Sequence, residues 1–190
     1  MTNDFQLQEV RSNNHYCTSC KNYEIITFNN GHFKSYLRLD TSLFVHNEGP
    51  QQNKLAGFWE DHVHQNSARV SYHTISDSND RYMDSLVLKT YVYNSGSRNI
   101  KENYKLLTLS WHQVESMTIN GEHLEIDIKI LDDKYQFQLN QNLPISVTRT
   151  SSLSTMFDMS LARHYYGGPD SIPAPHDMKL WIKYDEIMLK

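Results

Sequence analysis

Several features that define common protein classes are missing from this sequence. It contains no run of about 18 consecutive apolar residues, so we expect no segment to cross a membrane as a helix. It has no block of basic residues, and its 18 Lys and Arg are outnumbered by 22 Asp and Glu, which gives a formal net charge of -4. A protein that binds the phosphate backbone usually has the opposite balance, so we do not expect nucleic acid as a partner.

Other absences concern location and catalytic motifs. The stretch from Met1 to Glu9 is polar, unlike the apolar centre of a secretory signal, so we expect an intracellular, cytoplasmic protein. There is no G-x-S-x-G motif and no glycine-rich phosphate loop, since Gly167 and Gly168 are followed by Pro169 rather than by a helix start. These absences exclude a Ser hydrolase of the α/β class and a phosphate-loop nucleotide binder.

What remains is a chain of 190 residues and 22.3 kDa that is 38% hydrophobic and 12% aromatic. This length suits one domain with a sizeable core. Residues 1–22 are polar and lack hydrophobic periodicity, which predicts an N-terminal arm that does not pack. We expect residues 23–190 to form a single β domain.

Alternation of apolar and polar residues is the strongest structural signal. In the stretch 122–131, four apolar residues recur at every second position, and residues 135–139 alternate in the same way after the turn-forming Asp132-Asp133-Lys134. Asn120-Gly121 and Asn29-Asn30-Gly31 each predict a hairpin turn between flanking strands. About nine or ten such strands indicate an all-β fold, either an antiparallel β-sandwich or a jelly-roll-like barrel.

We expect one helix, near residues 152–165. Thr150-Ser151-Ser152 offers capping residues, and Leu153, Met156, Phe157 and Leu161 recur at helical spacing before Gly167. A single helix cannot supply the crossovers of a parallel sheet, so a parallel α/β fold is excluded.

Cys and His residues provide the candidates for a metal site. Cys17 and Cys20 form a C-x-x-C motif, and His62 and His64 form an H-x-H motif in which both imidazoles would share one face of a strand. Such ligands suit Zn or Fe, with His73 and His112 as distant partners. Neither motif has the spacing of a known site, so we favour ordinary thiols, unpaired in a reducing compartment, and surface His residues, with no cofactor.

The aromatic and basic residues provide the candidate binding surface. If the final strand buries its apolar face, Trp181 lies on the opposite face, flanked by Lys179 and Lys183. Tyr36 and Arg38 share the outer face of an earlier strand. These five residues form the predicted binding surface.

Taken together, these patterns favour a non-enzymatic module that binds protein or assembles with itself through this surface and the N-terminal arm. Its architecture is similar to that of viral jelly-roll coat proteins, a resemblance that rests on no motif. One alternative is a cupin-like metal-dependent β-barrel enzyme or small-ligand binder centred on His62 and His64. Another is single-stranded nucleic-acid binding through Tyr36, Arg38 or Trp181.

Overall fold

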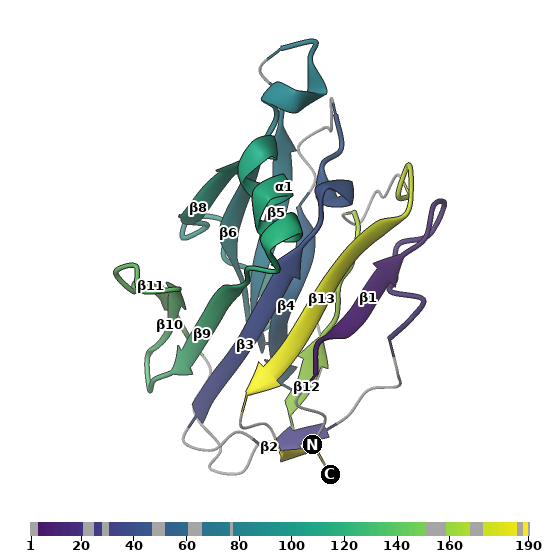
Figure 1. The fold of residues 1–190 in the computed structure, drawn as a ribbon. Helices are drawn as coiled ribbons and strands as arrows, with labels where there is room; N and C mark the ends of the chain where they lie inside the picture. Colours follow the sequence, from purple (N-terminus) through teal and green to yellow (C-terminus); the bar gives the residue numbers. More distant parts are fainter. Residues whose placement is uncertain are drawn as a thin grey trace.

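Two antiparallel sheets form the body of the protein, and they lie one in front of the other in Figure 1. The computed structural model describes residues 4–20, 25–27, 31–46, 52–60, 66–76, 78–150, 159–167, 173–185 and 188–189. The predicted all-β class is confirmed as a jelly-roll-like β-sandwich. In the part of the chain that is described, no helix is long and apolar enough to cross a membrane.

The front sheet has six strands. In spatial order they are β1 (Gln6–Val10), β13 (Met178–Asp185), β3 (His32–Leu39), β9 (Leu124–Ile130), β10 (Lys134–Leu139) and β11 (Ile145–Thr148).

The rear sheet has eight strands. In order they are β14 (Met188–Leu189), β2 (Ile25–Thr27), β12 (Met159–Ala162), β4 (Asn53–Glu60), β5 (Asn66–Ile75), β6 (Ser85–Asn94) and β7 (Ser97–Arg98), with β8 (Lys105–Ser110) also pairing with β6.

The inward-facing side chains of the two sheets meet in one core. The side chain of every second residue of β9 is buried, as its alternation predicts, and β9 pairs with β10 across the predicted turn. Aromatic rings join the layers: the Phe58 ring of the rear sheet lies 5.9 Å from Phe33 and 6.0 Å from Tyr135 of the front sheet, measured between centroids.

The N-terminal segment contributes to the front sheet, whereas its polarity predicted an unpacked arm. Residues Gln6–Val10 pair with β13, and Val10 is fully buried. β1 is the edge strand of the sheet, where one side of the backbone needs no pairing partner and polar side chains are favoured. This explains the polar composition, while the division of the chain into domains stays a prediction.

The helix lies where a strand was predicted. α1 (Trp111–Asn120) is the one α-helix among the described residues, and it ends at Gly121, which has a φ of 67°. Asn120-Gly121 therefore ends a helix instead of forming a hairpin turn. The sequence pattern fits both, because a helix cap and a hairpin turn each require a positive φ. The capping box formed by Ser110 and Gln113 marks the start of this helix.

Two further predictions are corrected. The helix expected near 152–165 is wrong at Met159–Ala162, which forms β12 and pairs with β4, while residues 151–158 lie outside the described ranges. The hairpin expected around Asn29-Asn30-Gly31 is also wrong, because β2 pairs within the rear sheet and β3 within the front sheet. Local turn residues do not reveal which sheet the next strand will join.

The cap of α1 can be tested directly. Ser110→Ala removes the side-chain oxygen that accepts from the backbone N–H of Gln113, and we expect it to lower the free energy of unfolding by about 1 kcal/mol. Ser116→Ala, at an exposed position within the same helix, is the matched control and should have no destabilising effect. Urea unfolding monitored by circular dichroism compares the two, and equal stabilities would contradict this account of the cap.

Gly57 in β4 is required by the close approach of β4 and β5. Its φ is 145°, and a Cβ added there would lie 2.3 Å from the Ala68 carbonyl oxygen and 2.6 Å from Arg69 Cα. Backbone atoms cannot yield as a side-chain end can, so no side chain fits at this position without shifting a strand.

We therefore expect Gly57→Ala to destabilise the protein by about 2 kcal/mol or more. Gly121→Ala is the control: its φ of 67° is also positive, but its added Cβ would meet nothing within 4 Å, so only the conformational cost of about 1 kcal/mol applies. Urea unfolding of both variants separates the steric from the conformational cost. A Gly57→Ala variant as stable as Gly121→Ala would contradict the steric argument.

Candidate functional site

The outer face of the rear sheet carries the candidate site. Ala68, Val70 and Tyr72 of β5 belong to the core, so the alternation of the strand turns Arg69 and its neighbours to the outer face. In the register of the sheet Arg69 lies between Gly57 of β4 and Tyr91 of β6.

A β-bulge brings a lysine to the same face. The register between β4 and β5 shifts between Lys54 and Ala56, so that Lys54 lies opposite Ser71 and Ala56 lies opposite Val70. Without the extra residue the alternation would place either Lys54 or Gly57 on the core face. The bulge therefore allows both Lys54 and the glycine that accommodates Arg69 to face outwards.

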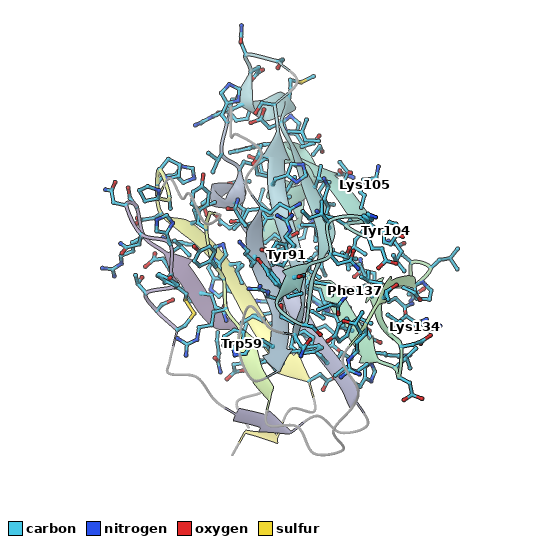
Figure 2. The ribbon with its side chains drawn as sticks, turned by 180° about the vertical axis from the view of Figure 1, so that it is seen from behind. Trp59, Tyr91, Tyr104, Lys105, Lys134 and Phe137 are labelled. Atoms are coloured by element: carbon cyan, nitrogen blue, oxygen red, sulfur yellow. A yellow bond between two sulfur atoms is a disulfide. The ribbon has the colours of Figure 1, made fainter. Side chains whose placement is uncertain are left out.

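Three cationic side chains surround one aromatic ring. Measured to the centroid of the Tyr91 ring, Lys54 Nζ lies at 5.0 Å, Arg69 Cζ at 4.8 Å and Arg98 Cζ, from β7, at 4.8 Å. Figure 2 looks onto this side of the molecule, with Tyr91 near the middle of the sheet and Trp59 below it. We call Lys54, Arg69, Arg98 and Tyr91 the cation cluster.

The cation cluster lacks a balancing negative charge. Within the described ranges, no ion pair joins Lys54, Arg69 or Arg98 to a carboxylate. Arg69 is only 6% exposed, and its Nε and Nη2 atoms have no hydrogen-bond partner among the described residues. A buried guanidinium with unused donors carries a large desolvation cost, which an anionic ligand would offset.

Neutral hydrogen-bond acceptors hold the other two cations. Lys54 Nζ donates to the carbonyl oxygen of Gly167 at 2.8 Å, and Arg98 Nη2 donates to Gln52 Oε1. These contacts fix the positions of the cations without neutralising their charge.

The electrostatics of the cluster change the charge state of the lysine. Burial, with added repulsion from Arg69 and Arg98, lowers the pKa of Lys54 to about 7. Burial raises the pKa of Tyr91 to about 12 and lowers the pKa of Arg69. Near neutral pH the cluster thus combines charged guanidinium groups with an amine that can accept a proton and a phenol that keeps its own.

Tyr165 borders the cluster on the side of Lys54. Its backbone pairs with Lys54 through two hydrogen bonds, of 2.8 and 3.0 Å, and its ring centroid lies 4.7 Å from Lys54 Nζ. Tyr16 packs edge-on against this ring, with 5.2 Å between centroids. Burial is the main reason why the pKa of Tyr165 is raised, so its phenol is protonated at neutral pH.

The residue before Tyr165 anchors it to the interior. The buried His164 Nε2 lies 2.9 Å from the hydroxyl of Tyr72, and the His164 backbone N–H donates to Gln8 Oε1 at 2.8 Å. Burial lowers the pKa of His164 to about 3, so the ring is neutral. The position of Tyr165 therefore depends on the core and on β1.

No member of the cation cluster was predicted from the sequence. A signal was present, because the alternation of Val70, Tyr72 and Thr74 already implies that Arg69 faces away from the core. The cluster itself is not visible in the sequence, since its members come from β4, β5, β6 and β7 and the bulge sets the direction of Lys54.

The predicted binding surface lies on the outer face of the front sheet. β13 buries every second residue and leaves Trp181 partly exposed, as predicted, and Trp181 pairs with Arg38 and Lys183 with Tyr36. Lys179 Nζ lies 3.5 Å from Glu9 Oε1, and Arg38 Cζ lies 3.9 Å from the Phe5 ring. The structure brings the five residues onto one face, and their role in binding stays a prediction.

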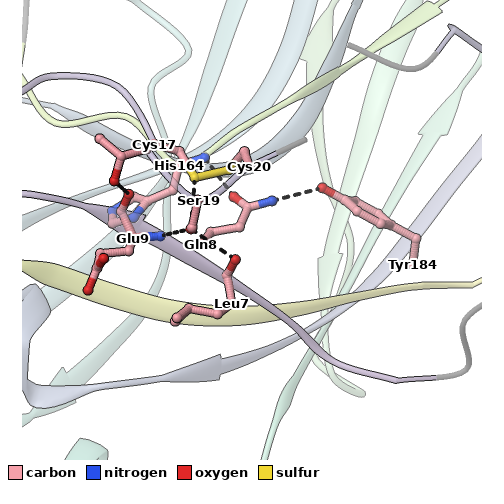
Figure 3. Close-up of a disulfide and its surroundings, with 9 residues drawn as sticks. Leu7, Gln8, Glu9, Cys17, Ser19, Cys20, His164 and Tyr184 are labelled. Atoms are coloured by element: carbon pink, nitrogen blue, oxygen red, sulfur yellow. Dashed lines mark hydrogen bonds between the residues drawn. A yellow bond between two sulfur atoms is a disulfide. The ribbon is translucent and has the colours of Figure 1, made fainter. Parts of the chain in front are cut away.

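The residues predicted as candidate metal ligands do not come together in one cluster in the part of the chain that the structure describes. Cys17 and Cys20 are joined in a disulfide, shown in Figure 3, in place of the predicted unpaired thiols; a disulfide sulfur is not a thiolate ligand. His62 and His64 lie outside the described residues. His73 lies on β5, whereas the exposed His112 lies on α1 beside Glu115, and no group of three or more His, Cys, Asp or Glu in the described ranges could hold a metal ion.

Comparisons with known proteins place the fold. No protein-family model and no curated protein matches the chain. Among solved structures, it is similar to the alginate lyase Aly36B, with a TM-score of 0.52 at 10% identity over 97% of this chain and 80% of that chain. A mutant of that enzyme in complex with an alginate trisaccharide matches with a TM-score of 0.53 at 9% identity, over 95% and 79% of the two chains. The alginate lyase vAL-1 from Chlorella virus matches with a TM-score of 0.50 at 12% identity, over 98% and 85%.

These neighbours correct the functional prediction. The three solved structures named above, which share this fold, are alginate lyases and not subunits of an assembly. The expectation of a non-enzymatic, self-assembling structural module, similar to a viral coat protein, is therefore wrong. It rested on the polar and aromatic outer faces of the predicted strands, which do not by themselves identify a function.

Proposed function

We propose that this protein is a lyase that cleaves an acidic polysaccharide built from uronate sugars, with the cation cluster as its active site. The observation that carries the proposal is the burial of Arg69 beside Lys54 and Arg98 without a carboxylate partner among the described residues. Every uronate unit carries a carboxylate that could supply the missing charge. The shared fold with enzymes named as alginate lyases supports the same class of substrate.

The two guanidinium groups are suited to hold the substrate carboxylate. A guanidinium presents paired donors that match the two oxygens of a carboxylate. Neutralising this carboxylate makes the C–H bond on the adjacent ring carbon, C5, more acidic, because the charge that develops there spreads onto the carboxyl group. We assign this role to Arg69 and Arg98.

Lys54 is the proposed base. A pKa of about 7 leaves part of the amine neutral at physiological pH, and its hydrogen bond to Gly167 fixes the nitrogen. The amine takes the proton from C5, the electron pair of that C–H bond forms the C4=C5 double bond, and the bond from C4 to the glycosidic oxygen breaks.

Tyr165 is the proposed acid. Its phenol lies beside Lys54, and its raised pKa keeps it protonated until the leaving oxygen takes the proton. Tyr91 is more deeply buried, and its ring contacts the three cations. The reaction as proposed requires no metal cofactor, because the chain supplies the positive charge itself.

Activity on polyuronates is the direct test. Purified full-length protein is incubated with alginate, polygalacturonate and polyglucuronate, and the conjugated double bond of the product is followed by ultraviolet absorbance. We expect Lys54→Met and Tyr165→Phe to lower kcat by about 100-fold or more, while Arg98→Gln should both raise KM and lower kcat, because Arg98 is proposed to hold the carboxylate and to stabilise the charge that develops on it. Lys105→Met, at an exposed position on β8, is the matched lysine control and should retain activity.

The outcomes of this experiment separate the possible roles of the site. Binding of a uronate oligosaccharide without unsaturated product would assign the site to carbohydrate binding and contradict the lyase proposal. An absence of both binding and product would remove the proposal altogether. With an active enzyme, kcat/KM should rise with pH through about 7, as Lys54 loses its proton.

The charge state of Lys54 also predicts a pH dependence of stability. Between its lowered pKa of about 7 and its ordinary value of 10.5, the unfolded chain binds a proton that the folded protein does not. The free energy of unfolding should therefore rise with pH from 7 to 9. Lys54→Met should be more stable than the wild type at pH 7 and should show a smaller rise, whereas Lys105→Met should resemble the wild type. Urea unfolding at both pH values measures this, and an unchanged rise in Lys54→Met would contradict a buried, neutral amine.

A further inference from the structure

A second pocket lies near one end of the sandwich, where α1 meets two short 3-10 turns, η2 (Thr41–Leu43) and η3 (Arg81–Met83). In Figure 1, η2 lies beside α1, and η3 forms the teal turn at the top. The pocket has a volume of about 570 Å³, and none of its lining residues belongs to the cation cluster. This volume falls within the range of small-ligand sites.

One wall of the pocket is aromatic. The ring of Trp111, at the start of α1, lies 5.0 Å from Phe44 and 5.4 Å from Tyr82, measured between centroids. The Trp111 indole Nε1–H is buried and has no hydrogen-bond partner among the described residues. Arg81 extends over this ring, with its Cζ 5.7 Å from the centroid, and its guanidinium is bonded only through Nη2 to the hydroxyl of Tyr82, within the described contacts.

A buried carboxylate orients a histidine in the same pocket. Asp84 is fully buried, and its two carboxylate oxygens lie 3.2 and 3.0 Å from His46 Nδ1. Since a carboxylate accepts, Nδ1 carries the proton and donates to Asp84, and no described residue bonds Nε2 of the half-buried ring. Asp84 is thus a positioning residue for His46.

The opposite side of the pocket supplies further polar groups. His176 Nε2 donates to the carbonyl oxygen of Ser42 at 2.8 Å, which holds the ring at the pocket. Asp40 Oδ1 accepts from the backbone N–H of Ser42 at 2.8 Å, which leaves its second oxygen as an acceptor. The pocket therefore combines an exposed cation, an apolar face and hydrogen-bonding groups on two histidines and a carboxylate.

We propose that this pocket binds a single uronate sugar, as a second carbohydrate site separate from the cation cluster. The carboxylate would meet Arg81, the sugar hydroxyls would hydrogen-bond with His46 Nε2 and Asp40, and the C–H face of the ring would lie on Trp111. A simple anion would use only Arg81, and a neutral sugar would leave Arg81 without a carboxylate partner. The choice of a sugar rests on the proposed function, whereas the arrangement of donors and acceptors does not.

Nuclear magnetic resonance of the full chain with 15N-labelled tryptophan tests this assignment. The indole signal of Trp111 is identified by its loss in Trp111→Phe, and D-glucuronate, glucose and acetate are titrated separately. We expect glucuronate to shift the Trp111 signal to saturation, with weaker effects of glucose and acetate. Arg81→Gln should weaken glucuronate binding by about tenfold, which corresponds to the loss of one charge-assisted contact.

Two controls separate this pocket from the active site. Arg11→Gln removes an arginine whose side chain is 66% exposed and should leave glucuronate binding unchanged. Lys54→Met, in the cation cluster, should abolish polysaccharide cleavage and preserve the Trp111 response. If no polyuronate is cleaved but the Trp111 signal still responds to glucuronate, the proposed lyase activity is wrong and the proposed second sugar site is retained.

The proposal is overturned by any of three results: no response of Trp111 to glucuronate, an equal response to acetate, or wild-type affinity in Arg81→Gln. Arg81 is exposed, so its replacement is not expected to affect folding.

Discussion

The burial of positive charge on the outer face of the rear sheet is the constraint on which the rest of the site depends. Lys54, Arg69 and Arg98 share the ring of Tyr91 and no carboxylate of the described chain. Neutral residues at these positions would carry a smaller desolvation penalty. The cluster therefore lowers the free energy of unfolding, and an anionic ligand would offset part of that loss. The same burial lowers the pKa of Lys54 to about 7. In the proposed lyase reaction, charge recognition and proton transfer would therefore have one physical cause.

Backbone irregularities in β4 make this burial possible. Regular alternation cannot turn both Lys54 and Gly57 outwards, and the bulge between Lys54 and Ala56 resolves the conflict. Gly57 then leaves the space beside Arg69 that any Cβ would fill. The two features act together: the bulge places the amine, and the missing side chain allows the guanidinium to lie close to the sheet.

These features also explain which parts of the fold and of the candidate site could be predicted from the sequence. Alternation predicted β9, β10 and the partly exposed position of Trp181, because period two is a local property of a strand. Asn120-Gly121 was misread because a positive φ serves a helix cap as well as a hairpin, and the Ser110–Gln113 capping box that distinguishes them was overlooked. The cation cluster could not be predicted, since its three charges come from three different strands and the direction of Lys54 depends on a bulge that no residue type in the sequence indicates.

The N-terminal strand connects the fold with the site more closely than its polar sequence suggests. β1 supplies Gln8, which accepts from the backbone of His164, and the following loop supplies Tyr16, which packs on Tyr165. Figure 3 shows Gln8 between His164 and Tyr184, close to the disulfide. The backbones of Tyr165 and Lys54 are hydrogen-bonded to each other. A displacement of β1 would therefore shift the proposed acid and the proposed base together. The segment predicted to be a free arm is therefore a structural part of the proposed active site.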